Sequence, residues 1–130
     1  AGFTNILVLN GHGGNIAPCQ GLWGQFLHRL ELNLHFKSYW DFISPAEAEP
    51  YLETNRFPGH AQEFETAFAM AAFPENVRHA AMQDQEDKEP LYATAENGKA
   101  LIELAVNNVA SFVQEMIDGK EIAEIPAFHP

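Results

Sequence analysis

Near its amino terminus the chain reads Ile6-Leu7-Val8-Leu9-Asn10-Gly11-His12-Gly13-Gly14-Asn15, an apolar run that leads into a histidine among glycines. Four consecutive aliphatic residues are typical of a strand that is buried on both faces of a parallel sheet. The histidine follows where such a strand passes into a helix, and ligands of open α/β sheets bind at that edge. The stretch therefore predicts a buried strand from Thr4 to Leu9, with His12 as a candidate functional side chain just beyond it.

Periodicity beyond this turn predicts the remaining elements. Asn15 is expected to cap a helix, with Pro18 in its first turn and an apolar face made of Leu22, Phe26, Leu27 and Leu30. An alternating aromatic stretch, Leu34 to Trp40, reads as the next strand, so that strand, helix and strand form a right-handed parallel βαβ unit. Further helices are expected at Pro45–Leu52, with Ser44 as cap, and at Gln62–Phe73. The longest helix is expected at Thr94–Asp118, with an apolar face from Leu101 to Met116 and Gly119 as its stop. The segment Arg78–Glu89 is expected to be irregular and Ile122–Pro130 to be loose.

Size and charge limit the classes of function. A chain of 130 residues predicts a single domain, 1–130, and 46% hydrophobic residues is an ordinary globular composition. No apolar run approaches the ~20 residues of a membrane span, so no membrane partner is expected. The net charge is −11 with only seven Lys and Arg, which argues against a nucleic-acid partner. Cys19 is the one cysteine, and a chain without an internal disulfide fits a cytoplasmic setting.

A second polar segment, His60-Ala61-Gln62-Glu63-Phe64-Glu65-Thr66, lies fifty positions after the first. Imidazole and carboxylate groups bind zinc, iron or manganese, and they also serve as general acids and bases. His60 and Glu63 are three residues apart and can converge from one helix face, or His60 can precede the helix and leave Glu65 pointing inward. The alternative is that both glutamates are acids favoured by the helix dipole, worth ~0.3–1 kcal/mol each.

The surroundings of His12 favour a binding role. Gly13 and Gly14 leave room for a ligand to approach the imidazole, although a turn histidine that bonds only to backbone remains the alternative. The spacing is not a G-x-G-x-x-G fingerprint, and no P-loop lysine follows. Trp40 closes the second predicted strand at the same sheet edge, where it would form either core or the wall of a pocket.

Together, the two motifs resemble the creatininase (creatinine amidohydrolase) family. Its Asn-Gly-His-Gly-Gly-Asn pattern stands at Asn10–Asn15, and its His-Ala-Gly-x-x-Glu-Thr pattern stands at His60–Thr66, with Gln62 in place of the glycine. The segments Pro74–Arg78 and Ala93–Ala100 also resemble family segments, in the same order.

The resemblance implies a three-layer α/β/α fold with a mainly parallel sheet. It also implies a hexameric hydrolase that opens a C–N bond of a small cyclic or linear amide, using water activated by two divalent metal ions, Zn, Mn or Fe. His12 and Glu65 would be metal ligands and His60 the neighbouring catalytic histidine. From the residues themselves, Glu63 is expected to be the catalytic partner of His60, and the expected substrate-binding residues are Gly13, Gly14, Asn15 and Trp40.

The chain departs from the family at one point. The family's Glu-x-His motif and the aspartate that bridges the metals are not found, so the resemblance covers the C-terminal part of a family member and the sheet is expected to lack its N-terminal strands. Two ligands are fewer than the three that catalytic zinc keeps, so this chain alone is expected to be inactive. A sheet without those strands has an unpaired edge, so the chain is also expected to form a homo-oligomer. The alternative function is a non-catalytic α/β module for oligomeric assembly or small-molecule binding.

Overall fold

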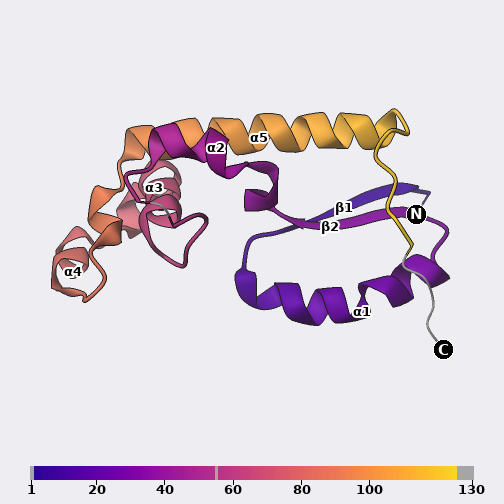
Figure 1. Cartoon of the computed structure of the whole chain (residues 1–130), viewed down its shortest axis with the longest axis horizontal. Coiled ribbons are helices and arrows are strands. Elements are labelled where there is room, and N and C mark those ends of the chain that lie inside the picture. The colour runs from indigo at the N-terminus through magenta and orange to yellow at the C-terminus, as the bar shows by residue number, and fades with distance from the viewer. Residues whose placement is uncertain (1, 55, 126–130) are drawn as a thin grey trace. The chain divides into compact units, whose positions relative to one another are not determined.

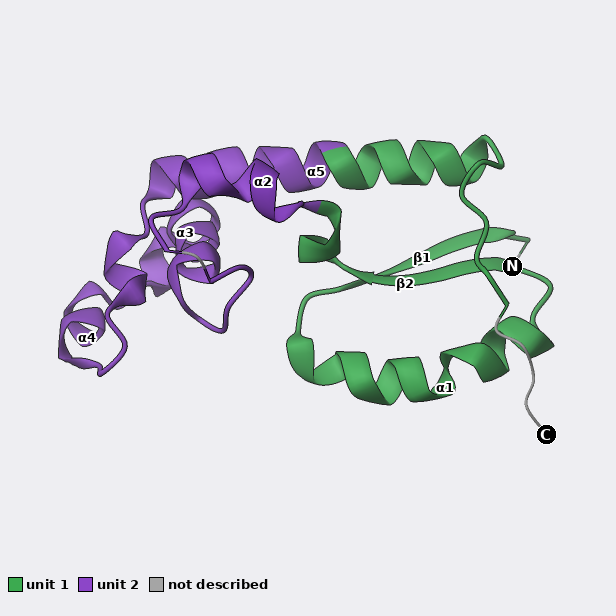
Figure 2. Ribbon diagram, in the orientation of Figure 1, with its two compact units in different colours: residues 1–42, 108–130 green, residues 43–107 purple. Residues whose placement is uncertain are grey.

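The computed structural model describes residues 2–54 and 56–125 (Figure 1). The chain divides into two compact units (Figure 2). The sheet unit comprises residues 1–42 and 108–130, and the helical unit comprises residues 43–107. The long helix α5, Ala95–Ile117, contributes residues to both.

The sheet unit contains two parallel strands between two helical layers. Strand β1, Asn5–Asn10, pairs with β2, Asn33–Ser38, in a register that places Asn5 beside Asn33 and Asn10 beside Ser38. Helix α1, Ile16–Arg29, and the C-terminal half of α5 lie on opposite sides of the strands (Figure 2). An aromatic contact lies at each of these two interfaces. The ring centroids of Trp23 on α1 and Phe36 on β2 are 5.3 Å apart, and those of Phe112 on α5 and His35 on β2 are 5.1 Å apart. The predicted α/β class and parallel pairing are confirmed.

The prediction of a buried first strand is wrong for the chain as described. Val8 and Leu9 of β1 are 41% and 48% exposed, and only Asn10 of this strand is buried. The reason is the size of the sheet: within the described residues it has two strands, so β1 has a hydrogen-bonded neighbour on one side only.

Helix α1 also differs in detail from the prediction. Asn15 precedes it, but its side chain makes no capping hydrogen bond and instead donates to Asn10. Of the predicted apolar face only Leu27 is buried, whereas Leu22, Phe26 and Leu30 are each more than 40% exposed. Trp23 makes the contact with the sheet instead.

The second strand is shorter than predicted. β2 ends at Ser38, and Tyr39–Phe42 form a 3-10 turn, η2, so Trp40 does not close the strand. At this end of the strand the backbone N–H of Ser38 donates to Oδ2 of Asp41 at 2.8 Å, so the turn bonds back to the last residue of β2.

The helical unit consists of short helices packed beside the first half of α5. Ser44 caps α2, Pro45–Ala48, as predicted, and the structure adds a capping box with Glu47. The predicted helix at 62–73 is observed as α3, Glu63–Ala72, and its buried Phe64 meets Phe57 edge to face with ring centroids 4.8 Å apart. The expectation of an irregular 78–89 is wrong in part, because α4 spans His79–Asp84. The remaining turns are η3, Glu49–Tyr51, η4, Pro74–Asn76, and η5, Glu89–Tyr92.

Helix α5 confirms the predicted boundaries within one residue at each end. The hydroxyl of Thr94 accepts from the backbone N–H of Asn97, and Gly119 takes a positive φ of 72° beyond the last turn. This left-handed stop is the reason for a glycine at that position. The following segment is held by a hydrogen bond from Ala123 N–H to Asn33 Oδ1 at 2.8 Å, and residues 126–130 of the predicted loose tail lie outside the described residues.

None of the helices in residues 2–54 and 56–125 combines the length and the apolar character needed to cross a membrane.

Candidate active site

The His12 turn lies directly after the carboxyl end of β1. His12 has extended backbone angles, φ −143° and ψ 128°, and begins a 3-10 turn, η1, Gly13–Asn15. Its Nδ1 accepts a hydrogen bond from the backbone N–H of Gly14 at 3.2 Å, and the residue is exposed. The imidazole is thereby oriented by the turn, and no hydrogen bond to its Nε2 occurs within the described residues.

Gly14 is required beneath this ring. A Cβ at position 14 would lie 2.8 Å from Cε1 and 3.0 Å from Nδ1 of His12, closer than packed atoms approach. Gly13 differs, because a Cβ there would meet no atom within 4 Å. Of these two glycines predicted to bind substrate, Gly14 therefore has a steric role in placing the histidine.

Asn10 organises the turn from the buried end of β1. Its Nδ2 donates to the carbonyl of His12 at 2.9 Å and to Ser38 Oγ at 2.8 Å. Its Oδ1 accepts from the backbone N–H of His12 at 3.1 Å and from Nδ2 of Asn15 at 3.0 Å. The sequence pattern gave Asn10 no role, and the available signal was its position directly after four aliphatic residues of the strand.

The predicted substrate-binding residues of the sheet unit are placed unequally. Asn15 is exposed and its amide nitrogen is held by Asn10. Trp40 is half-buried in η2, where its ring meets Tyr39 edge to face at 4.9 Å. The role of each as a substrate contact stays a prediction.

In the helical unit, His60 precedes α3, and this was one of the two arrangements that the sequence left open. His60 is exposed, and its backbone N–H donates to Gln62 Oε1 at 3.3 Å. Ala61 follows with a positive φ of 52° and donates its N–H to Glu65 Oε2. Glu65 is half-buried and lines a cavity of about 290 Å³ together with Thr66, Asn76 and Arg78.

Glu63 is the most deeply buried of the predicted site residues, with no exposed surface. Its Oε1 accepts from the backbone N–H of Glu53 at 2.8 Å, and its Oε2 accepts from that of Thr54 at 2.7 Å. Glu63 is therefore not a surface glutamate that only the helix dipole favours, which was the alternative interpretation. The structure gives Glu63 a role in fixing the loop before α3, while its catalytic role stays a prediction.

Gln62, which replaces the glycine of the family pattern, has a structural partner. It is buried, and its Nε2 donates to Asp87 Oδ2 at 2.8 Å. The backbone N–H of Glu89 and this amide lower the pKa of the Asp87 carboxyl below its usual value. The substitution therefore links the start of α3 to the segment before η5, a link that the motif alone did not indicate.

The donor atoms present do not form a complete metal centre. His12 and Glu65 belong to different units, and no group of three or more His, Cys, Asp and Glu side chains is placed to hold an ion in the described part of the chain. Ligand histidines usually donate their second ring N–H to an acceptor, whereas Nδ1 of His12 accepts one. The chemistry of each donor suits zinc or manganese, but the described residues by themselves do not fit the metal site.

Comparison with known families agrees with the two motifs. The family model described as creatininase, creatinine amidohydrolase, matches residues 1–92 of the 130. The chain belongs to the creatininase family. The matched region includes both the His12 turn and the His60–Thr66 segment, and it ends before the Ala93–Ala100 segment that also resembles the family. No curated protein and no solved structure matches the chain significantly.

Membership of the creatininase family relates this chain to hydrolases that act on amides. The described residues supply a creatininase motif histidine with one ring nitrogen bonded, and a motif glutamate with one carboxylate oxygen bonded. The second ring nitrogen of His12 and the second carboxylate oxygen of Glu65 therefore remain for a further partner.

Proposed function

We propose that this chain carries part of the active site of a creatininase-type amidohydrolase, which hydrolyses a C–N bond of a small cyclic or linear amide. The observation that carries the proposal is the His12 imidazole, which is oriented by Gly14 at the carboxyl end of β1 and exposes Nε2. That end of a parallel sheet is where α/β proteins bind their ligands.

The chemistry proposed for His12 depends on which of its two ring nitrogens is already hydrogen-bonded. Because Nδ1 accepts an N–H, the neutral ring of His12 carries its proton on Nε2. With this proton, Nε2 can donate to the carbonyl oxygen of an amide, where negative charge develops during attack by water. As a metal ligand, the ring would instead have to present Nε2 without its proton. We assign the neighbouring Gly13, Asn15 and Trp40 to the substrate, and His60, Glu63 and Glu65 to the same reaction as its acid, base and ligand groups.

The incomplete donor set limits what the isolated chain achieves. Catalytic zinc usually keeps three protein ligands and a water, and its ability to lower the pKa of that water depends on this coordination. We therefore expect binding of zinc or manganese to be weak, and turnover of creatinine or formamide-type substrates to be indistinguishable from background.

The test is an assay of the purified chain with added zinc or manganese, beside isothermal titration with each metal alone. His12→Ala and Glu65→Gln should each lower the metal affinity further, whereas His79→Gln, at an exposed histidine outside both motifs, should leave it unchanged. Metal-dependent turnover of the wild-type chain that His12→Ala abolishes would show that the described residues suffice. Metal binding that neither variant changes would contradict the assignment of both ligands.

A second candidate function is a non-catalytic module that acts in oligomeric assembly or small-molecule binding. The incomplete donor set and the exposed apolar side chains of β1 and α1 favour it. A stable oligomer in which neither zinc nor manganese binds, and in which His12→Ala changes nothing, would support this function over hydrolysis.

A further inference from the structure

We infer that the outer edge of β2 binds an extended basic peptide, which adds to the sheet as a further strand. The site is a cavity of about 370 Å³ within the sheet unit, here called the edge cavity. It is lined by Leu34–Lys37 of β2, by Trp23 and Leu27 of α1, and by the segment Glu121–Glu124. None of the residues that we assign to hydrolysis lines it, so this inference does not depend on the proposed function.

The edge cavity runs along the side of β2 that faces away from β1. Successive side chains of a strand point to opposite faces of the sheet. Here Phe36 contacts Trp23 on the α1 face, whereas His35 contacts Phe112 on the α5 face. Consecutive residues from both faces can line one cavity only where it follows an edge of their strand. Among the described residues none from β1 lines it, so this edge is the outer one.

The outer edge of β2 has backbone groups to offer. Within the described residues the sheet contains only β1 and β2, so the N–H and C=O groups of β2 that point away from β1 have no neighbouring strand. The segment after α5 is held by a side chain instead, because Asn33 Nδ2 donates to the carbonyl of Glu121 at 2.8 Å and Asn33 Oδ1 accepts from the N–H of Ala123 at 2.8 Å. No backbone–backbone hydrogen bond joins this segment to β2 in the described part of the chain.

The dimensions of the edge cavity suit a short added strand. The stretch Leu34–Lys37 spans about 13 Å at ~3.3 Å per residue, which is enough to pair with a few residues of an extended peptide. Main-chain hydrogen bonds supply the affinity in this mode of recognition, and pockets for alternate side chains supply the specificity. Trp23 and Leu27 provide an apolar wall for such side chains.

The charges of the edge cavity favour a basic peptide. Glu121 and Glu124 bring two carboxylates to the segment that lines it. Lys37 is the one lysine or arginine among the described lining residues, and its Nζ lies 5.4 Å from the ring centroid of Phe112 and 6.0 Å from that of Phe42. Because this ammonium group lies over aromatic rings on the α5 face, the two carboxylates determine the charge at the edge. The net charge of −11 has the same sign and attracts cations at longer range.

The experiment titrates the isotopically labelled 130-residue chain with a short capped peptide of alternating lysine and valine and follows the chain by NMR. Saturable binding should shift the backbone amides of Leu34–Lys37 and the indole N–H of Trp23. A peptide of alternating glutamate and valine should bind at least roughly tenfold more weakly, since its charge is opposite. The lysine peptide with every internal amide N-methylated keeps its charge but has lost its backbone donors, and it should not bind.

Glu121→Gln combined with Glu124→Gln should weaken binding of the lysine peptide by roughly fivefold at low salt. The matched control combines Glu75→Gln with Glu86→Gln, which changes the net charge equally at two exposed residues of the helical unit. This control should bind the peptide as the wild type does.

Three outcomes would overturn the inference. The lysine peptide could fail to bind saturably, or it could shift the amides of β1 and leave those of Leu34–Lys37 unchanged. The N-methylated peptide could bind as well as its parent, and charge alone would then explain the binding. If the amides of Leu34–Lys37 shift with protein concentration before any peptide is added, a second copy of the chain occupies this edge, which equally contradicts a peptide site.

Discussion

Glu63 and Thr54 are joined by a hydrogen bond of 2.7 Å, in which the buried carboxylate Oε2 accepts from a backbone N–H. The other oxygen accepts from Glu53, so one side chain at the start of α3 holds two consecutive amides of the preceding loop. A buried carboxylate with backbone donors on both oxygens is a strong local constraint, since bonds to a charged group contribute about 1.5–3 kcal/mol each.

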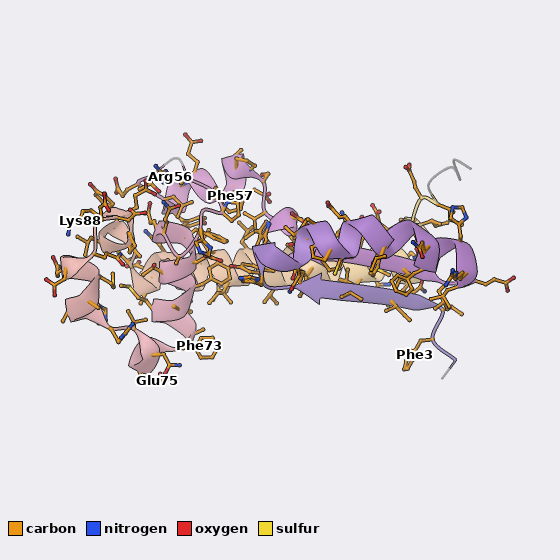
Figure 3. The ribbon with its side chains drawn as sticks, turned by 90° about the horizontal axis from the view of Figure 1, so that it is seen from below. Phe3, Arg56, Phe57, Phe73, Glu75 and Lys88 are labelled. Carbon is orange, nitrogen blue, oxygen red and sulfur yellow. The ribbon has the colours of Figure 1, made fainter. Side chains whose placement is uncertain are left out.

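We expect Glu63→Gln to destabilise the chain by about 2–3 kcal/mol, because its amide NH₂ would face a backbone N–H that has no other acceptor. Urea unfolding followed by circular dichroism gives the change in midpoint. Glu75→Gln is the control, at an exposed glutamate that is labelled in Figure 3, and it should change stability by less than about 0.5 kcal/mol. Equal midpoints for the two variants would contradict a structural role for Glu63.

A second prediction concerns the contact between α3 and α5 within the helical unit. A Cβ added at Gly98 would lie 1.9 Å from the carbonyl oxygen of Ala67 and 2.4 Å from its carbon. Because these are backbone atoms, Gly98→Ala must separate the helices, and we expect a loss of about 3 kcal/mol or more.

Gly21→Ala in the interior of α1 provides the opposite case. No atom lies within 4 Å of a Cβ at that position, so the helix propensity of alanine should raise stability by about 0.5–1 kcal/mol. Thermal melts of both variants test the pair. If the Gly98→Ala chain has the same melting temperature as the wild type, then α3 and α5 do not approach each other so closely.

The third prediction is a pH dependence that arises from His35. Burial, and secondarily the charge of Lys37, lower the pKa of this imidazole from its usual 6.5. Below pH 6.5 the unfolded chain binds a proton that the folded chain resists, so the stability contributed by neutral His35 falls as the pH drops toward the folded pKa. Above pH 6.5 the residue is neutral in both states and contributes no slope.

His35→Phe should reduce the acid-side slope of the free energy of unfolding, since it keeps an aromatic ring against Phe112 without a titrating group. Unfolding by urea at several pH values between about 5 and 8 measures the slope. His79→Gln removes an exposed histidine and should keep the wild-type slope. An unchanged slope in His35→Phe would mean that other groups cause the acid sensitivity.

The fourth prediction is that the chain self-associates through its sheet unit. Val8 and Leu9 on β1, and Leu22 and Phe26 on α1, are each more than 40% exposed, and exposed apolar patches commonly mark interfaces. The net charge of −11 opposes nonspecific aggregation, which favours a defined oligomer. Sedimentation at micromolar concentration should show a species larger than the monomer.

Leu22→Glu should weaken this association, whereas Leu91→Glu, at a 38% exposed leucine of the helical unit, should not. Phe3 and Phe73 are also exposed, at 74% and 58% (Figure 3), and they offer further positions to test in each unit separately. A wild-type chain that stays monomeric and melts cooperatively would exclude an interface at this surface.

Local patterns in the sequence determined much of this protein. The boundaries of α3 and α5, the cap at Ser44 and the stop at Gly119 were all predicted, because each depends on residues within one or two turns of one another. The parallel pairing of β1 with β2 and membership of the creatininase family were equally readable from a βαβ pattern and two motifs.

Tertiary structure alone decided the roles of several polar side chains. Asn10 meets Ser38 across 28 positions and Gln62 meets Asp87 across 25, and no local pattern encodes either pair. The burial of Glu63 rather than Glu65, and the exposure of Val8 and Leu9, likewise depend on which segments pack against them. The physical reason is common to all of these residues: a side chain acquires its burial and its hydrogen-bond partners from distant parts of the chain, and those become neighbours only on folding.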